Sequence, residues 1–259
     1  MIGGAESARF GPAGISPDAS QTRHTPRPGT IVSHTTEIKK SLPKLPTIFE
    51  GLNDDELRRI GAPCVTVSLD NKCYLFHQHH PAKSAFIVKE GELMIERTSA
   101  TGKRQIMAFI CPGNFIGFTH NDHYEFSVQA LTKCTLIEIP LANLLKLADE
   151  MVQLKSNLGR ISSNVLAHAL DQVFALGQKK AHERVCFLLY QLLERDTNTE
   201  RQIKLTMTRQ DIADYLGLTI ETVSRAFAKL KNEGLLNIHS AHTIEILDLK
   251  TVKDYALSE

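Results

Sequence analysis

Three side chains of different chemistry share one side of a short predicted helix near the C-terminal end of the sequence. Glu221, Ser224 and Arg225 fall on one arc of this helix, because each residue turns an α-helix by about 100°. In the major groove of DNA an arginine fork matches the two acceptors of guanine, a carboxylate accepts from cytosine, and a hydroxyl serves either kind of partner. The three residues therefore predict a surface that reads base edges.

Two predicted helices joined by a tight turn must position this surface. Thr208 is expected to cap the first helix with Asp211 completing a capping box, and Gly217 is expected to end that helix. Thr219 is expected to cap the second helix. The opposite arc of the second helix carries the side chains expected to pack, which are Ile220, Val223, Phe227 and Leu230. Residues 206–234 therefore predict a helix-turn-helix with one packed face and one presented face.

Hydroxyl and basic side chains around this unit are candidates for contacts with the DNA backbone. Such contacts fix the register of a protein on the duplex without reading its sequence. Over residues 178–233, ten basic residues against eight acidic ones leave a net charge of only +2, so base contacts must contribute much of the binding. The predicted phosphate contacts are Thr206, Thr208, Arg209, Thr219, Thr222 and Lys229.

The string TMTRQDIADYLGLT, followed by ETVSR, resembles the helix-turn-helix of the CRP/FNR family of bacterial transcription regulators. In that family the positions of Glu221 and Arg225 read bases. Ser224 matches the serine of the FNR branch, and Ile220 replaces a further base-reading arginine of the CRP branch. The resemblance implies a homodimer that binds inverted TTGAT half-sites in double-stranded DNA rather than TGTGA. It also implies contact with RNA polymerase and control of genes for low-oxygen or nitrogen-oxide metabolism.

The composition is that of a soluble globular protein long enough for one large or two ordinary domains. The 259 residues are 42% hydrophobic, and 30 Lys and Arg nearly balance 29 Asp and Glu. The five cysteines form no CxxC pair, which fits a reducing cytoplasm and argues against a disulfide framework or a zinc ribbon. No apolar run approaches the roughly 18 residues that span a bilayer. We therefore expect a cytoplasmic protein without a membrane partner.

Short β-prone runs separated by turn sequences predict a β jelly roll over residues 37–148, with one short helix near residues 53–60. Residues 1–36 are rich in Gly, Pro, Ser and Thr, which predicts a disordered leader. By resemblance, the jelly roll corresponds to the cyclic-nucleotide-binding sensor domain of the family. The expected fold class is α+β, with this domain followed by a long dimerisation helix and a winged helix-turn-helix.

The residues that bind an effector elsewhere in the family are replaced here. The family's cyclic-nucleotide site holds the phosphate with an Arg–Ser pair, whose positions carry Tyr124 and Glu125. Because a buried phosphate needs charge-assisted donors and a carboxylate repels it, we expect no cyclic-nucleotide binding. No cysteine precedes Cys64, and Ile137 occupies the position of the fourth iron–sulfur ligand, so no cluster is expected. The resemblance is therefore to the cluster-free, FixK-like branch, with no cofactor and an unknown effector.

Histidines in two predicted turns leave an alternative open. His77 and His79 match the spacing of the first cupin metal motif, in which Ser84 replaces the glutamate. A cupin-like metalloenzyme or a haem-binding sensor would use them with nearby histidines. The missing carboxylate, and the lack of a histidine after Gly113 where the second motif places one, favour solvent-exposed turn histidines. We expect no metal and no catalytic residue. The remaining histidines of the two turns are His80, His120 and His123.

Apolar residues return to helical spacing between residues 141 and 177. Asp149 and Glu150 favour a helix N-terminus near them, and Gly177 is expected to end the helix, which gives a dimerisation helix over residues 149–177. One stripe should cover the sensor domain and another should meet its copy as in a short coiled coil. The predicted dimer contacts are Leu158, Ile161, Val165 and Ala169.

The rest of the chain predicts a winged helix-turn-helix domain over residues 178–251. An amphipathic helix is expected at residues 182–193, with Cys186 as an apolar filler on its buried face. Residues 235–238 and 243–247 predict a β-hairpin, the wing, whose tip carries His239 and His242 as candidate phosphate contacts. Two such domains in a dimer would place recognition helices about 34 Å apart on a palindrome.

Overall fold

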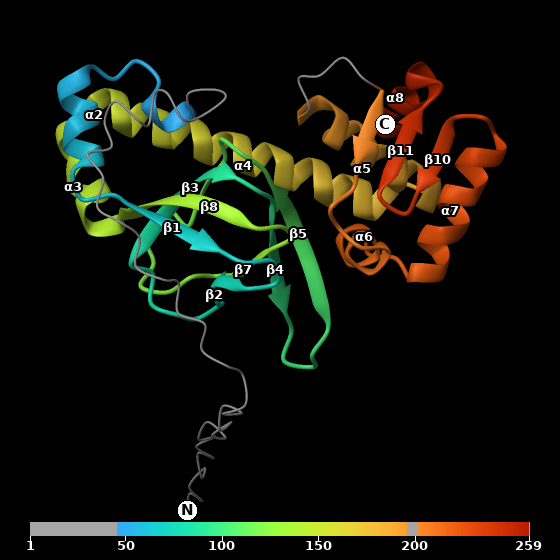
Figure 1. The fold of residues 1–259 in the computed structure, drawn as a ribbon, viewed down its shortest axis with the longest axis horizontal. Helices are drawn as coiled ribbons and strands as arrows, with labels where there is room; N and C mark the ends of the chain where they lie inside the picture. Colours follow the sequence, from blue (N-terminus) through green and yellow to red (C-terminus); the bar gives the residue numbers. More distant parts are fainter. Residues whose placement is uncertain (1–45, 196–200, 259) are drawn as a thin grey trace, which may run out of the picture.

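A computed structural model describes residues 46–195 and 201–258 of the chain. The predicted leader at residues 1–36 lies outside the described residues. Figure 1 shows an N-terminal β domain and a C-terminal domain built mainly from helices, connected by one long helix. This arrangement confirms the expected α+β fold with a β sensor domain ahead of a winged helix-turn-helix.

The β domain is a sandwich of two four-stranded sheets in which every pairing is antiparallel. One sheet has the order β1-β8-β3-β6 and the other β2-β7-β4-β5. The strands are β1 (Val65–Leu69), β2 (Tyr74–Phe76), β3 (Ser84–Glu90), β4 (Leu93–Thr98), β5 (Arg104–Ile110), β6 (Phe115–Ile116), β7 (Ser127–Ala130) and β8 (Cys134–Pro140).

Strand β3 reads as a continuous apolar run because both of its faces are covered. Phe86 and Val88 point into the space between the two sheets, whereas Ala85 and Ile87 belong to a separate cluster under the helices. Those helices are η1 (Thr47–Phe49), α2 (Asp54–Gly61), α3 (Leu141–Glu150) and the first part of α4 (Val152–Gln178). Asn53 caps α2 in a capping box with Glu56.

The long helical segment differs from its prediction at both ends. Asp149 and Glu150 form the last turn of α3 instead of the start of the long helix, because Met151 has an extended backbone (φ −113°, ψ 104°) and breaks the segment. Met151 is buried beside α3, so the break lets α3 lie on the sheet while α4 leaves toward the C-terminal domain. Helix α4 also continues through Gly177 to Gln178. In the described ranges, neither α4 nor any shorter helix combines the length and apolarity needed to cross a bilayer.

The C-terminal domain packs its helices around a three-stranded sheet of order β10-β11-β9. The β10–β11 hairpin is the predicted wing, whereas β9 and α8 were not predicted. Its elements are α5 (Ala181–Arg195), β9 (Gln202–Lys204), α6 (Arg209–Leu216), α7 (Ile220–Asn232), β10 (Leu236–Ser240), β11 (Thr243–Ile246) and α8 (Leu249–Leu257).

The two domains share a contact formed by β4 and β5 of the sensor domain against the C-terminal domain. Met94, Ile106 and Phe109 are each at most 3% exposed and belong to the same apolar cluster as the core of the C-terminal domain. The ring of Phe109 lies 5.1 Å from that of Tyr215 on α6. The sensor domain therefore packs directly on α6, the helix that precedes α7 in the chain.

Candidate nucleic-acid interface

Helix α6 begins and ends as the sequence predicts. The Thr208 hydroxyl accepts from the Asp211 amide at 3.1 Å, and the Asp211 carboxylate accepts from the Thr208 amide at 2.9 Å, which completes the capping box. Gly217 ends the helix in the left-handed conformation (φ 61°, ψ 39°), where glycine carries no Cβ penalty. The chain therefore turns sharply into α7.

Helix α7 has the predicted division into two faces, with one exception. Thr219 caps it by accepting from the Thr222 amide at 3.3 Å. Val223, Phe227 and Leu230 are buried in the domain core. Ile220 was expected on the packed face but is 38% exposed, because it lies in the first turn, beyond the edge of the core.

The presented face carries Glu221, Ser224 and Arg225, all three exposed. Arg225 donates to the Thr222 hydroxyl at 3.2 Å, and the Ser224 hydroxyl donates to the Ile220 carbonyl at 2.9 Å. Hydrogen bonds from its own backbone amide and from Thr219 lower the pKa of Glu221, so this carboxyl is ionised at neutral pH. The surface thus offers one anion, one cation and one hydroxyl to a partner.

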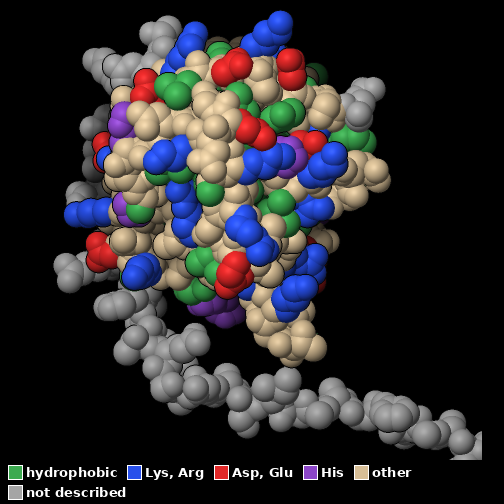
Figure 2. Space-filling view, turned by 90° about the vertical axis from the view of Figure 1, so that its right-hand side faces the viewer, with side chains coloured by type: hydrophobic (Ala, Val, Ile, Leu, Met, Phe, Trp, Pro, Cys, Tyr) green, Lys and Arg blue, Asp and Glu red, His purple; other side chains and the backbone are tan. Residues whose placement is uncertain are grey.

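The predicted phosphate contacts have different surroundings. Thr208, Thr219 and Lys229 are exposed, and Thr222 is half-buried. Lys229 lies 3.2 Å from the His182 ring and 3.7 Å from the carboxylate of Glu233. Figure 2 views the C-terminal domain end on and shows Lys and Arg spread across it with acidic side chains between them. This agrees with the small net charge expected for the segment.

Two of the predicted phosphate contacts are engaged inside the protein. The Arg209 guanidinium stacks 3.8 Å from the centre of the Phe227 ring, and its buried Nη1 atom has no partner among the described residues. Burial also lowers the pKa of Arg209. The Thr206 hydroxyl donates to the Glu92 carboxylate of the sensor domain. Neither side chain is turned freely toward solvent in this arrangement.

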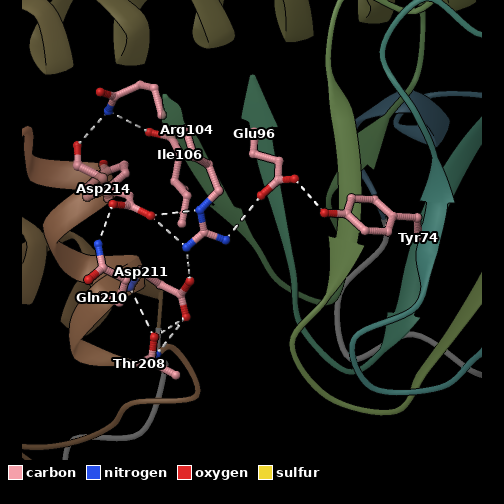
Figure 3. Close-up of polar contacts among 10 residues, drawn as sticks. Tyr74, Glu96, Arg104, Ile106, Thr208, Gln210, Asp211 and Asp214 are labelled. Atoms are coloured by element: carbon pink, nitrogen blue, oxygen red, sulfur yellow. Dashed lines mark hydrogen bonds and ion pairs between the residues drawn. The ribbon is translucent and has the colours of Figure 1, made fainter. Parts of the chain in front are cut away.

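An ion-pair network that the sequence did not suggest joins the sensor domain to α6 (Figure 3). Arg104 on β5 donates to Asp214 at 2.7 Å and to Asp211 at 2.5 Å, both on α6. Its third nitrogen reaches Glu96 at 3.3 Å, and Glu96 accepts from the Tyr74 hydroxyl at 2.8 Å. The two contacts of Arg104 with α6 join residues 107 and 110 positions apart, so no local pattern reveals them.

The charges in this network stabilise one another. Burial alone would raise the pKa of Asp211, but hydrogen bonds from Thr208 and Arg104 outweigh it and lower the pKa. Burial alone would lower the pKa of Arg104, but its bonds to Asp211 and Asp214 raise it. The guanidinium of Arg104 and the carboxylate of Asp211 therefore each favour the charged form of the other.

Aromatic rings fill the sensor domain around Tyr124, the residue predicted to stand at the position of the family's phosphate donor. Tyr124 is 5% exposed, stacks 3.7 Å from the Phe76 ring, and donates its hydroxyl to the Ser84 carbonyl at 2.7 Å. Glu125 points to solvent, where it accepts from Asn121 at 3.3 Å. Ile137 is buried beneath the helices. None of these residues presents a cation to the interior.

The histidines of the alternative hypothesis lie on the outer surface of the sandwich. His77 stacks 4.2 Å from the Tyr74 ring, and burial lowers its pKa. His77 and His79 line a surface pocket of about 380 Å³ together with Tyr74 and Glu96. Within residues 46–195 and 201–258, no group of three or more His, Cys, Asp or Glu side chains is arranged to hold a metal ion. His80, His120 and His123 are exposed.

The two histidines of the wing have partners within the protein, and Cys186 is buried. His239 lies 2.8 Å from Glu245 across the hairpin, and His242 lies 3.1 Å from the Leu205 carbonyl. Cys186 is fully buried in α5, and burial raises its pKa to about 12. Its burial agrees with the predicted place of Cys186 on the buried face of this helix.

Helix α4 presents an uncovered apolar row on its second half. Leu158 is 5% exposed and Ile161 packs partly against the same cluster, so both contact their own domain. Val165 is 60% exposed, and Ala169 is exposed as well. The row continues with Leu166, Leu170, Val173 and Phe174, which are 61%, 60%, 67% and 43% exposed.

A winged helix-turn-helix behind a β-sandwich sensor domain defines a DNA-binding transcription regulator. Residues 183–255 match the Crp-like helix-turn-helix domain, and residues 66–151 match the cyclic nucleotide-binding domain. The chain belongs to the CRP/FNR family of transcription regulators.

Similar proteins point to the same family. The nitrogen fixation regulation protein FixK of Azorhizobium caulinodans is 33% identical over 198 residues, which cover 75% of this chain and 79% of that protein. The transcriptional activator protein anr of Pseudomonas aeruginosa is 32% identical over 205 residues, covering 75% and 82%. The structure of FixK2 from Bradyrhizobium japonicum superposes with a TM-score of 0.72 at 28% identity, covering 76% of this chain and 98% of that one. These relatives are regulators of transcription and not enzymes.

Proposed function

We propose that this protein is a cytoplasmic homodimer that reads inverted TTGAT half-sites in double-stranded DNA through Glu221, Ser224 and Arg225. The observation that carries the proposal is that all three side chains are exposed on α7 while the opposite face of the helix is buried. Only the side chains on the outer face can enter the major groove.

Each of the three side chains has a role in this proposal. The Arg225 fork recognises the guanine of the half-site, since its geometry matches two acceptors on one base edge. The ionised Glu221 accepts from a cytosine amino group, and Ser224 completes the contact beside them. The phosphate contacts are assigned to Thr208, Thr219, Thr222 and Lys229, with Thr206 and Arg209 joining once they are released from their present partners.

The second copy binds along α4 in this proposal. Val165, Leu166, Leu170 and Val173 each leave 60% or more of their surface exposed, although helical periodicity places them on one side of α4. Burying large aliphatic side chains stabilises an assembly by about 1.5–3 kcal/mol each when burial is complete. A parallel pair of α4 helices covers this row and brings the two copies of α7 to one face of the dimer.

The regulated genes are proposed from the relatives. Three of the similar proteins are named for nitrogen fixation regulation and another, from Pasteurella multocida, is named an anaerobic regulatory protein. We assign this protein to the control of low-oxygen or nitrogen-oxide metabolism, acting through RNA polymerase. The Tyr124 ring occupies the interior where a cyclic phosphate would need donors, which supports a regulator that does not respond to cyclic nucleotides.

The test compares binding to a duplex with the inverted repeat and to duplexes with one or both half-sites scrambled. We expect tight binding to the intact repeat, a large loss with one half-site, and non-specific binding with none. Leu170→Asp places a charge in the proposed dimer contact and should give monomers with the affinity of a single half-site. Val152→Asp is the matched control, because Val152 is 85% exposed at the start of α4 and outside the apolar row. Equal binding to all duplexes, or a monomeric native protein that binds specifically, would contradict the proposal.

A further inference from the structure

The contact between β4–β5 and α6 has the composition of a specific interface. Its centre is apolar, with Met94, Ile106 and Phe109 buried in the core cluster of the C-terminal domain. Backbone groups across the contact are also paired, since Gln105 donates to the Tyr215 carbonyl at 3.2 Å and Arg195 donates to the Phe109 carbonyl at 2.8 Å. The contact therefore fixes how α6 is oriented toward the sensor domain.

The polar part of this interface contacts two carboxylates of α6. Arg104 bridges Asp211 and Asp214 of α6 and ties them to Glu96 of β4. Its side chain is 29% exposed, and those of the three carboxylates are 5% to 16% exposed. An ion pair that is this far from solvent is screened less by salt than one on the surface.

The second polar contact engages Thr206, which is one of the predicted phosphate contacts. Glu92, at the turn into β4, accepts a hydrogen bond from the Thr206 hydroxyl just ahead of α6. A DNA phosphate bound at that hydroxyl would lie beside the Glu92 carboxylate. Because the two groups are both anions, they repel each other and cannot both bind there favourably. The hydroxyl can serve only one of the two anions.

We propose that the β4–β5 hairpin is an autoinhibitory clasp, which holds α6 through Arg104 and occupies the Thr206 hydroxyl with Glu92 in competition with the DNA backbone. The protein binds DNA with high affinity only after the β4–β5 hairpin and α6 have separated. A signal that weakens the clasp therefore raises the affinity of the protein for DNA. Because the clasp and the DNA exclude each other, the coupling is reciprocal. The inference rests on the proposed phosphate contact at Thr206.

Two conservative variants break the clasp from opposite sides. Glu92→Gln removes the competing carboxylate, and Asp214→Asn removes one partner of Arg104 from α6. Each variant also loses one negative charge, which by itself favours DNA binding. The matched controls lose the same charge elsewhere in the same domain: Glu90→Gln for the first and Asp254→Asn for the second, since both residues are exposed.

The experiment measures the affinity of the full-length protein for a duplex with the inverted TTGAT repeat and for a scrambled duplex, together with amide hydrogen exchange of β4, β5 and α6 in free protein. The clasp predicts faster exchange in both clasp variants and an affinity for the repeat at least about five-fold above that of their controls, the lower end of typical allosteric coupling. Variants that gain no more affinity than their controls would overturn the clasp while leaving specific recognition intact. If native protein and variants all bind both duplexes equally, the proposed function fails instead.

Discussion

The recognition helix and the interior of the sensor domain belong to the same family fold but use their side chains in opposite ways. On α7 the polar residues Glu221 and Arg225 point to solvent, and apolar residues hold the helix in place. In the sensor domain the position of a phosphate donor holds Tyr124, which is buried and stacked on Phe76. One fold thus presents polar side chains in one region and buries aromatic rings in the other, so function must be argued from side chains in each region separately.

The largest expected effect comes from emptying the filled interior. Tyr124→Ala removes a buried ring and its hydrogen bond to Ser84, which should lower the free energy of unfolding by about 3–5 kcal/mol, as for other large-to-alanine changes in cores. Chemical denaturation measures this loss. Sequence preference in DNA binding should remain, because Tyr124 belongs to the core of the sensor domain, whereas α7 packs in the core of the C-terminal domain. Glu125→Ala is the control, since Glu125 is exposed and should cost little. An altered base preference would break the separation of the two regions.

A smaller effect is expected at Asp211, where α6 contacts the sensor domain. The pKa of Asp211 lies below the usual range, because hydrogen bonds from Thr208 and Arg104 outweigh the opposite effect of burial. Its stabilisation is therefore complete above the unfolded pKa of about 3.9 and is lost as pH falls through the lower folded value. Hydrogen bonds to charged groups contribute about 1.5–3 kcal/mol, which sets the expected size.

Asp211→Asn keeps a capping acceptor but cannot titrate, so unfolding free energies measured across this acidic range should fall less steeply than in native protein. Asp254→Asn serves as the control and should retain the native pH dependence. The same acidic slope in native protein and Asp211→Asn would contradict the role assigned to this carboxyl.

The smallest effect tests the sensor interior directly. Titration calorimetry of native protein with cAMP and cGMP should show no saturable heat at micromolar ligand, because the buried phosphate would lack charge-assisted donors beside Tyr124. Saturable binding of either nucleotide would contradict the view that the interior of the sensor domain, unlike the outer face of α7, has no ligand-binding role.

Local patterns in the sequence predicted the parts of the fold that depend on neighbouring residues. Thr208 and Thr219 act as caps and Gly217 ends α6, because each role is decided within one helical turn. The long helix was predicted to start at residue 149, whereas it starts at Val152, because helical spacing continues through Met151 and only packing on the sheet requires the bend. Ile220 was assigned to the packed face because its spacing fits, although the core ends before it.

Contacts between segments distant in the sequence limited how much of the site could be predicted. The face of α7 could be predicted because helical periodicity and the family resemblance both apply to it. The bridge from Arg104 to Asp214 depends on how two domains dock, and neither residue stands in a pattern that indicates a partner. The hydrogen bond of Thr206 to Glu92 was hidden for the same reason, so a predicted phosphate contact proved to have an internal partner.

The most direct test of base reading by α7 is the affinity of Arg225→Ala for a set of duplexes in which each base pair of the TTGAT half-site is changed in turn. Lys231→Ala removes the same charge from an exposed position at the end of the same helix and is the matched control. We predict that Arg225→Ala loses about 1–3 kcal/mol on the intact site and no longer discriminates at the guanine, while Lys231→Ala retains the native order of preferences. An unchanged order of preferences in Arg225→Ala would contradict the account.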